Sequence, residues 1–188
     1  MITIEQAIQA IYKLEIGSLE KLRTISSIET FSKGKILMRA DRVEGDLYII
    51  LDGLVRAYTL VNDNEFTFWF GRAGDPVLSM RSYIYGLKGY EDIEVLEEST
   101  FIRIPHSHLQ QLYAQDIEIA NWGRRLAEIE LVKAEELFIS RQFKTAGERY
   151  KELLDVSPDL IQRVPLGIIA SFLGITQVSL SRIRAELK

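Results

Sequence analysis

Apolar residues recur at helical spacing near both ends of this 188-residue chain, whereas in its middle they gather in short runs of branched and aromatic residues. The helical spacing predicts helices over residues 3–14 and 18–27, and again over 116–138 after Pro105. The short runs are typical of strands and lie at residues 36–38, 47–51, 54–58, 66–70, 93–96 and 100–104. We therefore expect an α+β fold in which residues 29–105 form an antiparallel β-barrel or jelly roll with flanking helices.

Turn signals stand between these runs. Asp52-Gly53 separates the runs at 47–51 and 54–58, and this dipeptide is typical of two-residue hairpin turns. It predicts that the two runs pair side by side in one sheet. Asn62-Asp63-Asn64 is a further turn signal before the run at 66–70.

Residues 164–184 have the pattern of two short helices joined at Gly174. Gly174 can adopt the left-handed conformation that ends a helix, and Thr176 can accept hydrogen bonds from the amides that begin the next one. The small Ala170 would let the two helices approach closely. The apolar residues of the two helices are Ile168, Ile169, Phe172 and Leu173, then Leu180, Ile183 and Leu187. This is the pattern of a helix-turn-helix, which predicts binding to double-stranded DNA.

The polar residues of the second of these helices are neutral donors and cations, with no acid before Glu186. A helix that enters the major groove needs cations for phosphates and forked donors for base edges. The alternative is an ordinary helical hairpin whose arginines are merely solvated. The distribution of charge favours DNA, because residues 140–188 hold eight Lys or Arg against five Asp or Glu, whereas residues 1–139 hold 15 against 22.

Composition argues against several other classes of protein. The chain has no cysteine and two histidines, so thiolate-bound clusters and thiol redox switches are excluded. His106 and His108 have a spacing found in metal-binding barrels, but such sites need a third histidine and a glutamate where Leu112 stands. We expect no enzyme activity, no metal site and no cofactor. The lack of a signal peptide and of an apolar run of about 20 residues predicts a cytoplasmic protein.

The helix expected over residues 116–138 carries an apolar stripe about two heptads long. Its members fall at alternating spacings of three and four residues, and they are Ile119, Trp122, Leu126 and Ile129. Such a stripe is typical of a coiled-coil seam, which predicts a homodimer. The other interpretation, equally open, is that this helix packs on its own barrel.

Several motifs follow this order of elements along nearly the whole chain. Phe31-Ser-Lys-Gly-Lys-Ile-Leu and Asp46-Leu-Tyr-Ile-Ile-Leu-Asp-Gly-Leu-Val-Arg lie in the barrel, Gly74-Asp75 follows, and Gly174-Ile-Thr-Gln-Val-Ser-Leu-Ser-Arg lies in the second helix pair. Together they resemble the Crp/Fnr family of bacterial transcription regulators. The resemblance implies a cyclic nucleotide-binding-like sensor barrel with N-terminal helices, a dimerisation helix and a helix-turn-helix domain, at residues 1–115, 116–139 and 140–188.

The resemblance implies a sequence-specific transcription regulator that binds a palindromic operator as a homodimer, with RNA polymerase as a further partner. Gln177 stands at the first exposed position of the reading helix, where its amide would pair with adenine. Val178 could make only an apolar contact, Ser179 matches a phosphate-contacting hydroxyl, Arg182 matches an arginine that reaches a base edge, and Arg184 points to a phosphate. The expected DNA-binding residues are Thr176, Gln177, Val178, Ser179, Arg182 and Arg184.

The barrel departs from the family pattern in the segment that would hold a cyclic nucleotide. Members that bind one have Gly-Glu shortly after Gly-Asp, and Arg-Ser or Arg-Thr about ten residues later, so that the acid binds the ribose and the arginine binds the phosphate. Here these positions hold Leu78-Ser79 and Gly89-Tyr90-Glu91, while Arg81-Ser82 comes too early. The acids Glu91 and Asp92 would repel an anion, so cyclic AMP is not expected to bind.

Three interpretations of that segment stay open: a filled structural core, which we favour, a site for a different small molecule, or a protein docking surface. Tyrosines would suit a planar or phenolic ligand, but they are also common in barrel packing. The candidate pocket residues are Leu78, Ser79, Arg81, Tyr83, Tyr85 and Tyr90. The alternative to a transcription regulator is a small-molecule-binding β-barrel whose C-terminal helices mediate protein interaction.

Overall fold

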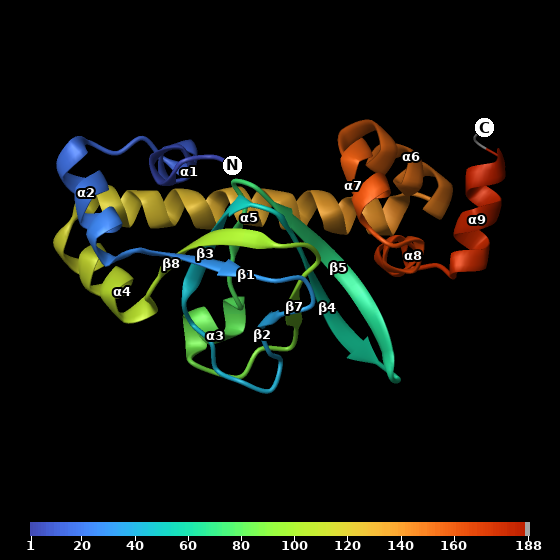
Figure 1. Cartoon of the computed structure of the whole chain (residues 1–188), viewed down its shortest axis with the longest axis horizontal. Coiled ribbons are helices and arrows are strands. Elements are labelled where there is room, and N and C mark those ends of the chain that lie inside the picture. Colours follow the sequence, from blue (N-terminus) through green and yellow to red (C-terminus); the bar gives the residue numbers. More distant parts are fainter. Residues whose placement is uncertain (187–188) are drawn as a thin grey trace. The chain divides into compact units, whose positions relative to one another are not determined.

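The computed structural model describes residues 1–186, which form nine helices and eight strands (Figure 1). The helices are α1 (Ile4–Ile11), α2 (Ile16–Ile25), α3 (Met80–Tyr85), α4 (His106–Gln115), α5 (Ile117–Phe143), α6 (Ala146–Val156), α7 (Pro158–Arg163), α8 (Leu166–Leu173) and α9 (Gln177–Glu186). The strands are β1 (Ser27–Phe31), β2 (Ile36–Met38), β3 (Leu47–Asp52), β4 (Leu54–Val61), β5 (Asn64–Arg72), β6 (Pro76–Val77), β7 (Asp92–Val95) and β8 (Ser99–Ile104). Leu187, the last residue of the predicted apolar stripe, lies outside the described residues.

The chain divides into two compact units. The first contains Met1–Ala57 and Phe70–Glu130, and the second contains Tyr58–Trp69 and Leu131–Lys188. The division falls inside α5, between Glu130 and Leu131. The domain limits expected from the sequence lie instead after residues 115 and 139, at the ends of the expected dimerisation helix. The turn end of the β4–β5 hairpin belongs to the second unit, together with the C-terminal helices.

Two four-stranded sheets form the barrel, with strand orders β1-β8-β3-β6 and β2-β7-β4-β5. In the first sheet β8 pairs antiparallel with both β1 and β3, so that Ile102 lies opposite Ile28 on one side and Ile49 on the other. Branched residues of β3 and β8 point into the core, as the period of two in a strand requires. The α+β fold with an N-terminal antiparallel barrel, a long helix and C-terminal helices is confirmed.

The predicted Asp52-Gly53 hairpin is wrong, because β3 and β4 lie in different sheets. Gly53 instead carries the chain from one sheet to the other at φ +111°, and a Cβ there would lie 2.0 Å from Ser99 Oγ. Only glycine fits this close approach. The two-residue hairpin turn is at Asn62 and Asp63, whose φ angles of 50° and 62° join β4 to β5.

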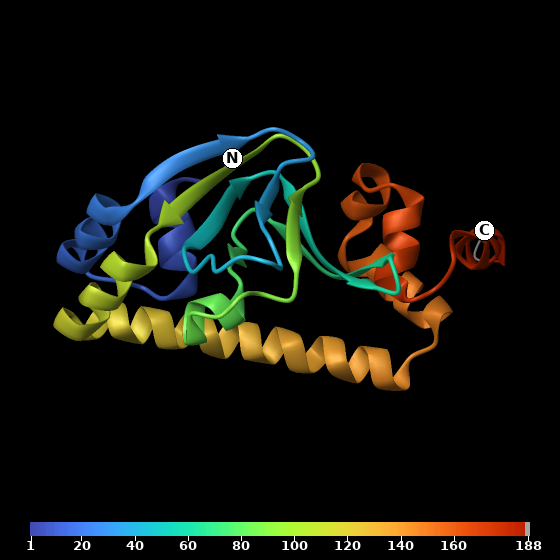
Figure 2. The same ribbon diagram turned by 90° about the horizontal axis from the view of Figure 1, so that it is seen from below.

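Helices α1, α2 and α4 gather around the N-terminal half of α5, as Figure 2 shows. Trp122 of α5 is fully buried and its Nε1 donates to the carbonyl of Ile8 at 2.9 Å. Ile119 and Leu126 enter the same hydrophobic cluster, which continues onto β3 and β8. The apolar stripe of α5 therefore packs on its own barrel.

Asp116 joins α5 to α2. Its carboxylate accepts from the amides of Glu118 (3.0 Å) and Ile119 (3.3 Å), and so caps α5, and it also binds Ser18 Oγ (2.9 Å) and Lys21 Nζ (2.7 Å). These donors, first of all Lys21, lower the pKa of Asp116 from 3.8 to about 2. The charged carboxylate therefore stabilises the folded chain.

Asp116→Ala should lower the free energy of unfolding at neutral pH by about 1–2 kcal/mol, mainly through the lost helix cap. Because the pKa is lowered on folding, the contribution of Asp116 is present above about pH 4 and is lost as the pH falls towards 2. Urea unfolding of both proteins at pH 6 and at about pH 3 measures this. A stability difference that grows on acidification would contradict the assignment.

No single helix within the described residues is long and apolar enough to span a membrane; α8 and α9 pass that test only as a pair, with a bend of 92° between them.

Candidate nucleic-acid interface

Helices α8 and α9 occupy the segment that the sequence predicts to be a helix-turn-helix. α8 ends at Gly174, whose φ is 69°, and the amides of Gly174 and Ile175 donate back to the carbonyls of Ser171 and Ala170 at 3.0 Å. Thr176 Oγ1 accepts from the amide of Ser179 at 3.2 Å, just where α9 begins. The left-handed glycine and the cap expected from the sequence are both confirmed.

Small and branched residues hold the two helices together. Ile169, Ala170 and Leu173 of α8 and Leu180 of α9 are all buried. Since the buried faces belong to the apolar stripe, the polar face of α9 points to solvent.

The exposed face of α9 carries donors and cations and no acid before Glu186. Gln177, Arg182 and Arg184 are exposed, and Val178 is 62% exposed. Among the described residues neither Arg182 nor Arg184 has a side-chain hydrogen bond or an ion pair, so both guanidinium groups are available to a ligand. The hydroxyl of Ser179 is half buried and lies 3.0 Å from Thr176 Oγ1. The six predicted residues thus extend along α9, from Thr176 just before the helix to Arg184 in its last turn.

The predicted dimerisation residues need a correction. Ile119 and Trp122 are fully buried and Leu126 is 8% exposed, all within the core of their own chain, and Ile129 is half buried. A second copy cannot reach the three buried side chains. The same helix exposes another set of large apolar residues further on: Leu131 (71% exposed), Val132 (52%), Phe138 (66%) and Ile139 (48%).

The candidate effector residues differ in exposure. Arg81, Tyr85 and Tyr90 are exposed, with Tyr85 at 74%. Tyr83 is half buried and its hydroxyl donates to Tyr113 at 3.2 Å. Burial raises the pKa of Tyr83.

The sequence did not single out Tyr113 as a packing partner of α5. Its ring lies against Gly123 of α5, where a Cβ would come within 2.5 Å. A glycine inside a long helical pattern was the available signal, since it costs about 1 kcal/mol relative to alanine and marks a close approach.

Leu78 and Ser79, the other two candidates, belong to the interior of the barrel. Leu78 packs on the core cluster, and Ser79 is 3% exposed with its Oγ lacking a hydrogen-bond partner among the described residues. A Cβ on Gly89 would lie 2.6 Å from Ser79 Oγ and 3.6 Å from Glu91 Oε2. Glu91 is 5% exposed and accepts from the amide of Tyr90 at 3.0 Å. Ser79, Gly89 and Glu91 thus pack closely together in the segment that departs from the family's ribose- and phosphate-binding pattern.

His106 has structural partners, whereas His108 is exposed. His106 packs edge-on against Tyr83, with ring centroids 4.8 Å apart, and its amide donates to Asp46. Within residues 1–186 no group of three or more His, Cys, Asp or Glu side chains is placed to hold a metal ion.

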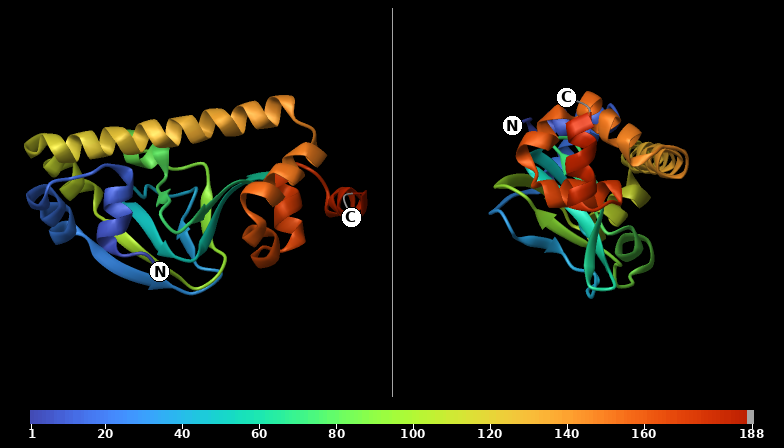
Figure 3. Two further views of the ribbon diagram at one scale, coloured as in Figure 1. Left: turned by 90° about the horizontal axis from the view of Figure 1, so that it is seen from above. Right: turned by 90° about the vertical axis from the view of Figure 1, so that its right-hand side faces the viewer.

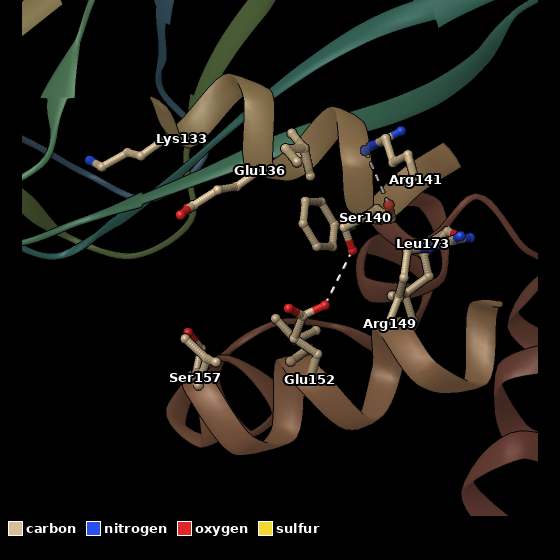
Figure 4. A pocket seen from close by; sticks show the side chains of 12 residues that line it. Lys133, Glu136, Ser140, Arg141, Arg149, Glu152, Ser157 and Leu173 are labelled. Carbon is tan, nitrogen blue, oxygen red and sulfur yellow. Dashed lines mark hydrogen bonds between the residues drawn. The ribbon is translucent and has the colours of Figure 1, made fainter. Parts of the chain in front are cut away.

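A cleft of about 250 Å³ lies in the second unit between α5, α6 and α8 (Figure 4). Ser140 and Glu152 hydrogen-bond across it at 3.2 Å. Arg141 and Arg149 donate to the last carbonyls of α8, those of Phe172 (3.3 Å) and Leu173 (2.7 Å). These arginines cap the C-terminal end of α8, a role that sequence reasoning missed because it depends on contacts between separate helices.

Comparison with known proteins gives the following findings. Residues 28–116 match the family model of the cyclic nucleotide-binding domain. A search of curated protein sequences gives no significant match. Solved structures that resemble the chain include FixK2 from Bradyrhizobium japonicum (22% identity, 87% of this chain and 84% of that chain, TM-score 0.74). The c-di-GMP-responsive global regulator CLP from Xanthomonas campestris is also similar, with 17% identity, coverage of 92% of this chain and 91% of that chain, and a TM-score of 0.74. A protein from Eubacterium rectale described as a transcriptional regulator of the Crp/Fnr family has 17% identity, coverage of 92% of this chain and 83% of that chain, and a TM-score of 0.73.

Proposed function

We propose that this chain, which has a cyclic nucleotide-binding domain and the fold of Crp/Fnr transcription regulators, is itself a sequence-specific DNA-binding regulator. The observation that carries this is the exposed face of α9. It presents Gln177, Arg182 and Arg184 to solvent with no acid before Glu186, on a helix whose opposite side is buried. Amide and guanidinium groups in this arrangement suit base edges and phosphates in a major groove.

The regulator acts as a homodimer. Leu131 and Phe138 are seven residues apart on α5 and therefore lie on one face of the helix. Both side chains are largely exposed in the single chain, and Val132 and Ile139 extend the apolar surface. A two-fold pair of α5 helices would bury these residues and present two reading helices to a palindromic operator, with RNA polymerase as the expected further partner.

Selection from random-sequence DNA tests this function. The wild-type chain should enrich a palindrome whose half-sites are about one helical turn, roughly 10 base pairs, apart. Failure to enrich any sequence, together with capture of a protein partner by α8 and α9, would favour the protein-interaction alternative.

Cyclic AMP should not bind this regulator. Ser79 and Gly89 pack against each other, and the buried carboxylate of Glu91 stands where a phosphate would need a cation. Calorimetry at cyclic AMP concentrations up to about 1 mM, well above the micromolar range of physiological ligands, should give no heat beyond dilution. A micromolar isotherm that cyclic GMP competes away would overturn this interpretation of the site.

A further inference from the structure

The turn end of the β4–β5 hairpin is bound to α8, the first helix of the helix-turn-helix, through Ser171. The hydroxyl of Ser171 accepts from the amide of Thr67 at 2.9 Å and donates to the carbonyl of Glu65 at 2.7 Å. One side chain of α8 thus takes both a donor and an acceptor from the backbone of β5. Thr67 is fully buried.

Arg141 of α5 contacts both β5 and α8. Its guanidinium lies over the ring of Phe66, 5.1 Å from the centroid, and over the ring of Phe172, at 5.7 Å. The Nη2 atom also donates to the carbonyls of Thr67 (3.5 Å) and Phe172 (3.3 Å). Among the described residues Arg141 has no carboxylate partner, and burial together with the charge of Arg149 lowers its pKa.

These contacts form a small two-point attachment, which we call the hairpin clamp: Phe66 and Thr67 of β5, Arg141 of α5, and Ser171 and Phe172 of α8. Figure 3 shows the hairpin end against the orange and red helices of the second unit. All five residues belong to the second unit, so the clamp attaches the turn end of the β4–β5 hairpin to α8 within that unit.

We propose that the hairpin clamp positions the helix-turn-helix for DNA binding, with Arg141 and Ser171 as positioning residues that do not touch DNA. The proposal rests on the proposed function. The clamp occupies α8 and leaves the reading residues Gln177 and Arg182 exposed. Holding α8 in advance removes part of the ordering cost that binding would otherwise carry.

Arg141→Met and Ser171→Ala test the clamp. Each should weaken binding to the selected operator about five- to thirty-fold, the effect of losing one or two kcal/mol. The dependence of affinity on salt should stay unchanged, because neither residue neutralises a phosphate. Arg141→Lys should fail to restore full affinity, since an ammonium cannot lie flat between two rings and fork to two carbonyls.

Hydrogen exchange gives a measurement that does not depend on DNA. The amide of Thr67 should exchange at least about tenfold faster in Ser171→Ala, since its acceptor is lost. Arg149→Met is the matched control, because the hydrogen bonds of Arg149 in the described part of the chain go to the carbonyls of Lys144 and Leu173 rather than to the hairpin. It should leave the exchange of Thr67 unchanged. If the wild type selects no DNA sequence, the proposed function fails, while this measurement still tests the attachment.

The chain has no cysteine, so Thr67→Cys with Ser171→Cys gives a clean cross-link. The oxidised form should bind the operator at least as tightly as the wild type, and reduction should weaken binding to the level of Ser171→Ala. Loss of DNA binding on oxidation, tighter binding by Ser171→Ala, or a reduced salt slope in Arg141→Met would each overturn the proposal.

Discussion

Leu131→Glu with Phe138→Glu should convert the protein to monomers and abolish tight operator binding at the same time. Burying a large apolar side chain is worth about 1.5–3 kcal/mol, and a two-fold interface buries each of these residues twice. Four glutamates in its place would also repel one another. Sedimentation equilibrium and operator binding on the same samples measure both effects. A variant that stays dimeric would show that the exposed face of α5 is not the interface.

Leu126→Ala is the matched control on the same helix. Leu126 lies in the core of its own chain, so truncation should cost about 2–5 kcal/mol of folding stability. It should leave dimerisation unchanged under conditions where the chain is folded. The two variants thus separate the buried stripe of α5 from its exposed apolar face.

Arg182→Ala and Gln177→Ala should each cost about 1–3 kcal/mol on the selected operator and relax the base preference at one or two positions per half-site. The reason is that each side chain is exposed on the reading helix and can contact a base edge through two hydrogen bonds. Repeating the random-sequence selection with each variant measures both the affinity and the preference.

Arg184→Ala is the control for these two variants. We assign Arg184 to a phosphate, so its loss should weaken all sequences about equally and reduce the salt slope by about one per reading helix. An Arg184 variant that changes base preference more than the Gln177 variant does would show that another face of α9 enters the groove.

The sequence predicted the last two helices and the turn between them closely because their signals are local. Gly174 and Thr176 act through the backbone conformation and hydrogen bonds of residues within four positions of themselves. The strand runs of the barrel were recognisable for the same reason, since a period of two is a property of consecutive residues. The turn and the strand runs can therefore be predicted without knowing how the remainder of the chain folds.

Local signals do not predict what an apolar helix face packs against. The stripe of Ile119, Trp122 and Leu126 has the same spacing whether it faces another chain or its own barrel, and only the packing of α1 and α4 decided between them. Asp52-Gly53 likewise has the composition of a hairpin, but the sheets formed by distant strands direct the chain across the barrel there.

Sequence by itself determined the kinds of element, their order, and the polar face of α9. Tertiary structure alone decided that Ser79 and Gly89 pack against each other, that Arg141 lies over the rings of Phe66 and Phe172, and which face of α5 stays exposed. The physical reason is the range of the interactions. Backbone preference and periodicity depend on neighbours in the chain, whereas burial and side-chain pairing depend on residues that only folding brings together.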